Sequence, residues 1–74
     1  MSEEVINRIR DFRARLGLTQ DELAQAVGVS RQSIISIERG RYTPSLYLGL
    51  RFAKFFNCSM DELFKLNQED QHVK

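Results

Sequence analysis

The segment "SRQSIISIERGR", residues 30–41, carries hydrogen-bonding side chains whose spacing would place them on one side of a helix. At about 100° per residue, Arg31, Gln32 and Ser36 share one arc, and Arg39 joins them. An arginine pairs with guanine edges or phosphate, a glutamine forms two hydrogen bonds with an adenine edge, and a small serine permits close approach. These side-chain types are suited to reading a DNA major groove.

Two members of the segment do not fit a purely polar face. Ile35 lies within the polar arc, where it either contacts a thymine methyl or packs against a neighbouring helix or subunit. Glu38 is an acid on a helix that would face DNA, at the boundary with the apolar side formed by Ile34 and Ile37. Glu38 therefore requires a cationic partner.

Capping signals place this segment within a series of short helices. The sequences "TQDE" at 19–22 and "SMDE" at 59–62 have the spacing of a capping box, in which side chain and backbone satisfy each other's free groups. Pro44 and three glycines mark interruptions between the helices. Together with apolar residues at helical spacing, these signals predict five helices at roughly residues 4–16, 19–27, 30–38, 45–56 and 59–65.

The two ends of this helical region leave an alternative open. The stretches "EVIN" and "ELFKLN" alternate enough to form short strands that pair with each other. Asn7 would then cap a shorter first helix.

The link between the second and third predicted helices is only "GV", residues 28–29. So short a connection containing glycine forces a sharp corner, which is the geometry of a helix-turn-helix. Residues 30–54 hold five basic and one acidic side chain, although the whole chain has a net charge of only +1. This local excess is what phosphate binding needs, and ordinary scatter of surface charge is the alternative.

Length and composition exclude several classes of protein. A chain of 74 residues fits one small domain, here residues 1–66 followed by a polar tail at 67–74. No signal peptide or membrane span is predicted, so we expect a cytoplasmic protein. Cys58 is the single cysteine, and no His, Cys, Asp or Glu cluster has metal-ligand spacing. Without a nucleophile, base and orienting group in sequence, we expect no enzyme activity and no cofactor.

Residues 12–64 resemble the Cro and phage-repressor type of helix-turn-helix domain, the XRE family. The motifs that carry the resemblance are "GLTQDELA", "GVSRQSI", "IERG", "PSL" and "ELF", in this order and spacing. The resemblance implies an all-α, five-helix lambda-repressor-like domain with its helix-turn-helix in the second and third helices. It also implies a transcriptional regulator whose recognition helix, about 30–38, enters the major groove of double-stranded DNA.

The resemblance assigns roles to matching positions. Base contacts are implied for the recognition-helix residues Arg31, Gln32 and Ser36, with Ile35 as a further candidate. Phosphate contacts are implied for two caps, the residue after the first cap, and the loop that follows the recognition helix: Thr19, Gln20, Ser30, Arg39, Arg41 and Thr43. A structural ion pair between Arg13 and Glu38 is also implied. Ser36 and Ile35 depart from the side chains of many relatives, so no sequence preference carries over.

The fourth predicted helix has more apolar residues than one core needs, which indicates a homodimer. The expected interface residues are Leu48, Phe52, Phe55, Phe64 and Leu66. A two-fold dimer would bind a roughly palindromic operator, and we expect the regulator to be a repressor. The alternative at this point is that the first and fifth helices cover the excess.

Two other functions remain open from sequence. One is an antitoxin or regulatory adaptor that mainly binds a protein partner through the fourth helix. The other is a structural helical bundle, which would show no salt-dependent affinity for DNA.

Overall fold

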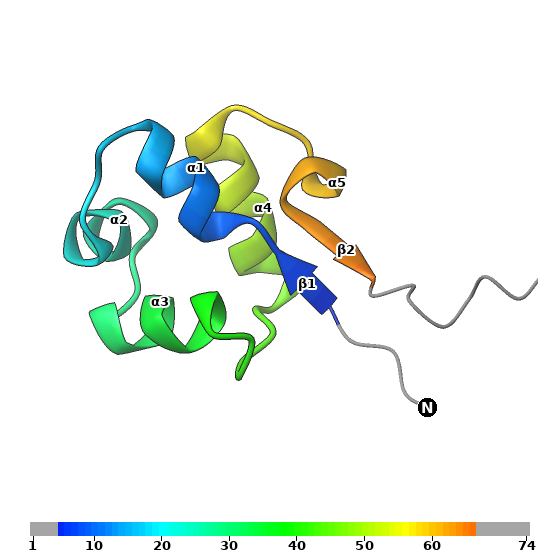
Figure 1. Cartoon of the computed structure of the whole chain (residues 1–74), viewed down its shortest axis with the longest axis horizontal. Coiled ribbons are helices and arrows are strands. Elements are labelled where there is room, and N and C mark those ends of the chain that lie inside the picture. The colour runs from blue at the N-terminus through cyan, green and yellow to red at the C-terminus, as the bar shows by residue number, and fades with distance from the viewer. Residues whose placement is uncertain (1–4, 67–74) are drawn as a thin grey trace, which may run out of the picture.

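The computed structural model describes residues 5–66, and these form five helices and two short strands (Figure 1). The polar tail at 67–74 and the predicted helix start at residue 4 lie outside the described residues. In chain order the elements are β1 Val5–Asn7, α1 Ile9–Arg15, α2 Gln20–Val27, α3 Arg31–Glu38, α4 Leu46–Phe56, α5 Met60–Leu63 and β2 Phe64–Leu66. The five predicted helices are thus present, together with the terminal strands that were left open as an alternative.

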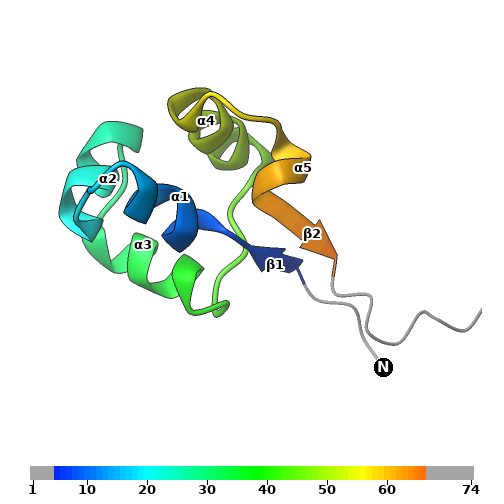
Figure 2. The same ribbon diagram turned by 45° about the horizontal axis from the view of Figure 1, so that its top comes forward.

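The two ends of the described chain differ from the helices predicted at residues 4–16 and 59–65. The first helix begins at Ile9, and residues 5–7 instead pair antiparallel with residues 64–66, in the register Val5 with Leu66 and Asn7 with Phe64. The two strands lie together at one end of the molecule, beyond the helices (Figures 1 and 2).

Asn7 joins this strand pair to the helices. Its Oδ1 accepts a hydrogen bond from the Ile9 backbone N–H at 3.1 Å. Its Nδ2 donates to the Ile37 carbonyl oxygen at 2.8 Å, at the end of α3. One side chain therefore satisfies a free amide at the start of α1 and holds the end of α3 beside it.

A single apolar core joins all five helices. Its fully buried large side chains are Ile9, Leu23, Ile34, Ile37, Phe52 and Leu63. Both predicted capping boxes form, at Thr19 with Glu22 and at Ser59 with Glu62. Within residues 5–66, no helix is long and apolar enough to cross a membrane.

Candidate nucleic-acid interface

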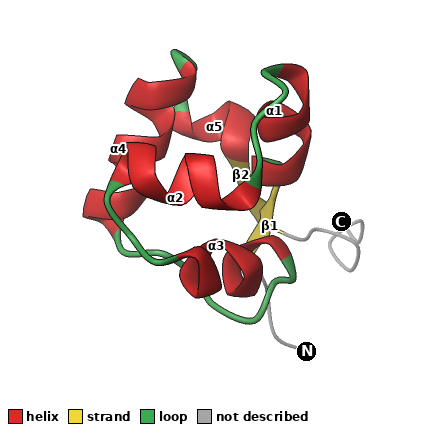
Figure 3. Ribbon diagram, turned by 90° about the vertical axis from the view of Figure 1, so that its left-hand side faces the viewer, coloured by secondary structure: helices red, strands yellow, loops and turns green. Residues whose placement is uncertain are grey.

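The corner between α2 and α3 depends on Gly28. Its φ of 82° lies in the left-handed region, where residues with a Cβ are strained. The backbone N–H groups of Gly28 and Val29 both donate to the Ala24 carbonyl oxygen, at 2.9 and 3.0 Å, which ends α2. α3 then starts after only three residues, 28–30, and lies across α2 (Figure 3).

The outer side of α3 holds the predicted base-contacting residues together. Ser30 begins the helix, and its Oγ accepts a hydrogen bond from the Ser33 backbone N–H at 3.1 Å. Arg31 and Gln32 are exposed and Ser36 is half-buried, on the side opposite the core. The hydrogen bonds among the described residues include none from the side chains of Arg31 or Gln32. Their donors and acceptors are free for a ligand.

Ile35 is half-buried on the same helix, and it is not one of the residues packed on the apolar core. Ile34 and Ile37, by contrast, are fully buried. Ile35 therefore lies on the outer side of α3, within the polar arc, and is only partly covered.

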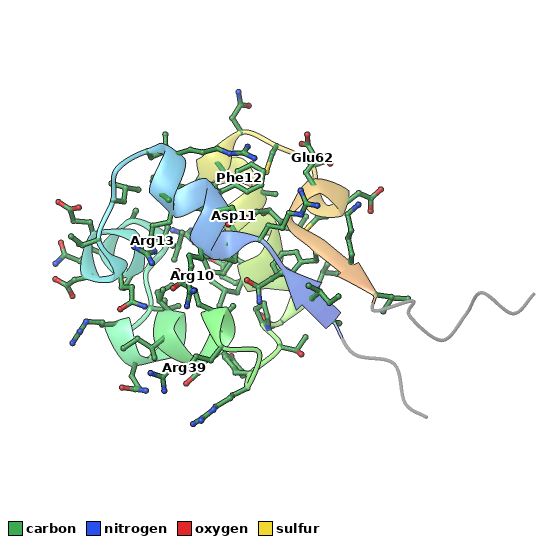
Figure 4. The ribbon with its side chains drawn as sticks, viewed as in Figure 1. Arg10, Asp11, Phe12, Arg13, Arg39 and Glu62 are labelled. Atoms are coloured by element: carbon green, nitrogen blue, oxygen red, sulfur yellow. The ribbon has the colours of Figure 1, made fainter. Side chains whose placement is uncertain are left out.

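An ion pair lies on the inner side of α3, at its last residue, Glu38. Arg13 donates from Nε and Nη2 to the two carboxylate oxygens of Glu38, at 2.7 and 3.1 Å. Gln20 adds a hydrogen bond from Nε2 to Glu38 Oε1 at 3.1 Å, and Arg10 lies 3.8 Å from the same oxygen. Arg13 also donates to the Leu18 carbonyl oxygen, so this cluster ties α1, α2 and α3 together (Figure 4).

The Glu38 side chain is fully buried, whereas that of Arg13 is 17% exposed. Burial by itself raises the pKa of Glu38, but the hydrogen bonds from Arg13 and Gln20 and the charges of Arg13 and Arg10 outweigh it and lower the pKa below its ordinary value. Glu38 is therefore ionised and structural. Sequence reasoning did not find Gln20 and Arg10 in this cluster.

The predicted phosphate-contacting residues lie on two segments: the start of α2 holds Thr19 and Gln20, and the start of α3 and the loop after it hold Ser30, Arg39, Arg41 and Thr43. Thr19, Ser30, Arg39, Arg41 and Thr43 are exposed and Gln20 is half-buried. The Arg41 backbone N–H donates to the Ser36 carbonyl oxygen at 2.9 Å, which turns the loop after α3 back along the helix. Tyr42, in this loop, faces a shallow hollow beside α3, and sequence reasoning missed it because no periodicity constrains a loop residue.

The predicted dimer interface needs correction. Leu48 is 6% and Phe52 0% exposed, because the protomer core encloses them, so they offer no surface to a second copy. Phe55 and Leu66 are exposed and Phe64 is half-buried. The apolar side chains that α4 does expose, besides Phe55, are Leu46, Tyr47 and Leu50.

Comparison with known proteins identifies the fold's family. The helix-turn-helix family HTH_3 matches residues 9–63, from the start of α1 to the end of α5. The chain belongs to this family. Its members are DNA-binding transcriptional regulators rather than enzymes, and the XRE-type resemblance is confirmed.

The chain is similar to regulators from archaea and bacteria. An HTH-type transcriptional regulator of Archaeoglobus fulgidus is 48% identical over 63 residues, covering 85% of this chain and 90% of the relative. The regulator YgzD of Bacillus subtilis is 42% identical over 64 residues, covering 86% and 97%.

Among solved structures, the restriction-modification controller protein C.AhdI of Aeromonas hydrophila is 31% identical with a TM-score of 0.68, covering 73% of this chain and 82% of that protein. A putative DNA-binding protein of Bacteroides fragilis is 26% identical with a TM-score of 0.74, covering 82% and 98%. This chain is accordingly a helix-turn-helix transcriptional regulator.

Proposed function

We propose that this regulator binds double-stranded DNA sequence-specifically as a homodimer and represses transcription at a roughly palindromic operator in the cytoplasm. The observation that carries the proposal is the outer side of α3, where the side chains of Arg31, Gln32 and Ser36 gather without hydrogen-bond partners among the described residues. Arg31 and Gln32 supply the donors and acceptors that distinguish guanine and adenine edges.

Phosphate contacts position this helix. The exposed Arg39, Arg41 and Thr43 follow α3, and Thr19 and Gln20 lie at the start of α2, whose free amides favour an anion. Contacts of this kind fix the register and supply salt-dependent affinity, while base contacts supply specificity.

The dimer is supported by apolar surface on one flank of α4. Leu46 is 70% and Leu50 51% exposed, and they lie one turn apart on this helix. Gly49 beside them approaches Phe64, so the flank continues towards β2, where Leu66 is 48% exposed. Phe55 lies about 140° around the helix from Leu50, next to Ala26 of α2. We assign the dimer interface to the flank with Leu46, Leu50 and Leu66.

Repression is supported by one relative. The transcriptional repressor RstR of a cryptic phage in Vibrio cholerae is 33% identical over 57 residues, although the alignment covers only 51% of that protein. A protein partner is the second candidate, because the same apolar flank suits a foreign chain as well as a second copy.

The test is selection of bound duplexes from random DNA at near-physiological salt, followed by sedimentation of the protein alone and with the selected site. We expect a two-fold symmetric motif with half-sites about one helical turn, about 34 Å, apart, and two protomers per duplex. Leu50→Arg should leave a monomer with weaker binding. The matched variant Phe55→Arg should still dimerise. A stable monomer that enriches no sequence would contradict the proposal and favour the protein partner.

A further inference from the structure

A shallow hollow lies between α3 and the loop that follows it. Its lining consists of three serines, one glutamine and one tyrosine: Ser30, Gln32, Ser33, Ser36 and Tyr42. Tyr42 is 46% exposed, which is high for so large an aromatic side chain. The hollow opens on the same side of α3 as the free amide group of Gln32.

The hollow has the wrong chemistry for a phosphate. No arginine or lysine lines it, and the hydroxyls of Ser30 and Ser33 are hydrogen-bonded to each other at 3.1 Å. Ser30 Oγ is also occupied as the cap of α3. The surface of the hollow is mostly carbon, and Tyr42 is the aromatic residue among its lining. An apolar group next to a hydrogen-bonding base edge fits it better.

From this arrangement, and resting on the proposed function, we propose that the hollow receives the C5-methyl group of a thymine in the major groove. Tyr42 would then be a specificity-determining residue. Thymine is the only base of ordinary DNA that presents a methyl in this groove, and adenine presents the edge that Gln32 can hold by two hydrogen bonds. The serines are short enough to let the base edge approach, and the Tyr42 ring closes the far wall.

The test replaces thymine with deoxyuridine, which removes only this methyl, one position at a time in the selected operator. For the wild-type protein, we expect one symmetric pair of positions at which uracil weakens binding about fourfold per methyl, the effect of exposing one buried carbon group. Tyr42→Ala changes both protomers, so it should bind the thymine operator about sixteenfold more weakly, about fourfold for each of the two methyls, and show no further loss with uracil. Tyr42→Phe should keep the discrimination, because the ring and not the hydroxyl forms the wall.

Tyr47→Ala is the matched control. Tyr47 is a second exposed tyrosine, on α4 and outside this hollow, and its loss should leave uracil discrimination unchanged. Equal affinity for thymine and uracil at every position of a bound operator would overturn the inference and leave the proposed function standing. Equal losses by Tyr42→Ala on operator and random DNA would also overturn it. Failure to enrich any sequence would overturn both proposals.

Discussion

The inner and outer sides of α3 differ in what holds their side chains. On the inner side, Ile34 and Ile37 are fully buried and the Glu38 carboxylate has partners from α1 and α2. On the outer side, Arg31 and Gln32 are exposed and have no side-chain partner among the described residues. One helix of eight residues therefore carries two separate functions: its inner side fixes its position, and its outer side is left for a ligand.

This difference means that substitutions on the two sides should fail in different assays. An inner substitution should lower the free energy of unfolding on its own, without DNA. An outer substitution should leave folding intact and change DNA binding. Four substitutions, and the pH dependence of one of them, test this separation in order of expected effect.

Ile37→Ala should give the largest effect. Removing a fully buried isoleucine leaves a cavity at the junction of α3 with Asn7 and the core, and should cost roughly 2–5 kcal/mol of unfolding free energy. Ile35→Ala is the matched control, with the same substitution two residues away on a half-buried side chain, and should cost about 1 kcal/mol or less. Urea titration followed by circular dichroism measures both. Equal losses of unfolding free energy would mean that the inner and outer sides of α3 contribute equally to stability.

Glu38→Gln should have the next largest effect. It keeps the shape but removes the charge that Arg13 and Gln20 bond, and hydrogen bonds to charged groups contribute about 1.5–3 kcal/mol. Asp11→Asn, at an exposed acid on α1, is the control and should change little. If both variants unfold at the same urea concentration as the wild type, the ion pair contributes no stability.

The same pair predicts a pH dependence. The pKa of Glu38 is lower in the folded protein than in the unfolded chain, so its contribution is fully present above the unfolded value of about 4.3 and disappears as the pH falls through the lowered folded value. The stability difference between wild type and Glu38→Gln should therefore be largest at neutral pH and shrink in acid. A difference that grows as the pH falls would mean that Glu38 is not held as a carboxylate.

Sequence patterns predicted the helix-turn-helix better than the chain ends, because different interactions determine the two. α2 and α3 begin one residue after the predicted caps Thr19 and Ser30. A cap is a local signal, because its side chain accepts a hydrogen bond from a backbone amide two or three residues further along the chain. The strand pair joins Val5 to Leu66, and no local signal fixes a partner that distant. For this reason the first helix was predicted too long.

In the candidate site, too, sequence patterns predict some residues, whereas the positions of others depend on tertiary packing. The outer residues of α3 follow from helical spacing alone, and they lie where the spacing placed them. The burial of Phe52 depends on how α2 and α5 pack on α4, which the apolar count of one helix does not determine. The hollow at Tyr42 depends on the fold of a loop, and the contact of Gln20 with Glu38 depends on the crossing of two helices.

Arg31→Ala tests the outer side of α3 directly. It should leave unfolding unchanged, cost about 1–3 kcal/mol of binding free energy on the selected operator, and relax preference at one base pair. Arg15→Ala is the control, because Arg15 is an exposed arginine at the end of α1 and does not belong to the outer side of α3. Fluorescence anisotropy with operator and scrambled duplexes separates the two. Equal losses on both duplexes would assign Arg31 to phosphate instead of a base.

Arg41→Ala should have the smallest and least selective effect. Its backbone N–H turns the loop after α3 and is kept in the variant, so only the exposed guanidinium is lost. If that group neutralises one phosphate, operator and scrambled duplexes should weaken by similar factors. Because the dimer carries two copies of this group, the slope of log affinity against log salt should fall in magnitude by about 1.8, from about 0.9 for each phosphate. Lys54→Ala removes an exposed charge from α4 and should leave the slope unchanged. A loss confined to the operator would place Arg41 on a base edge and extend the reading surface beyond α3.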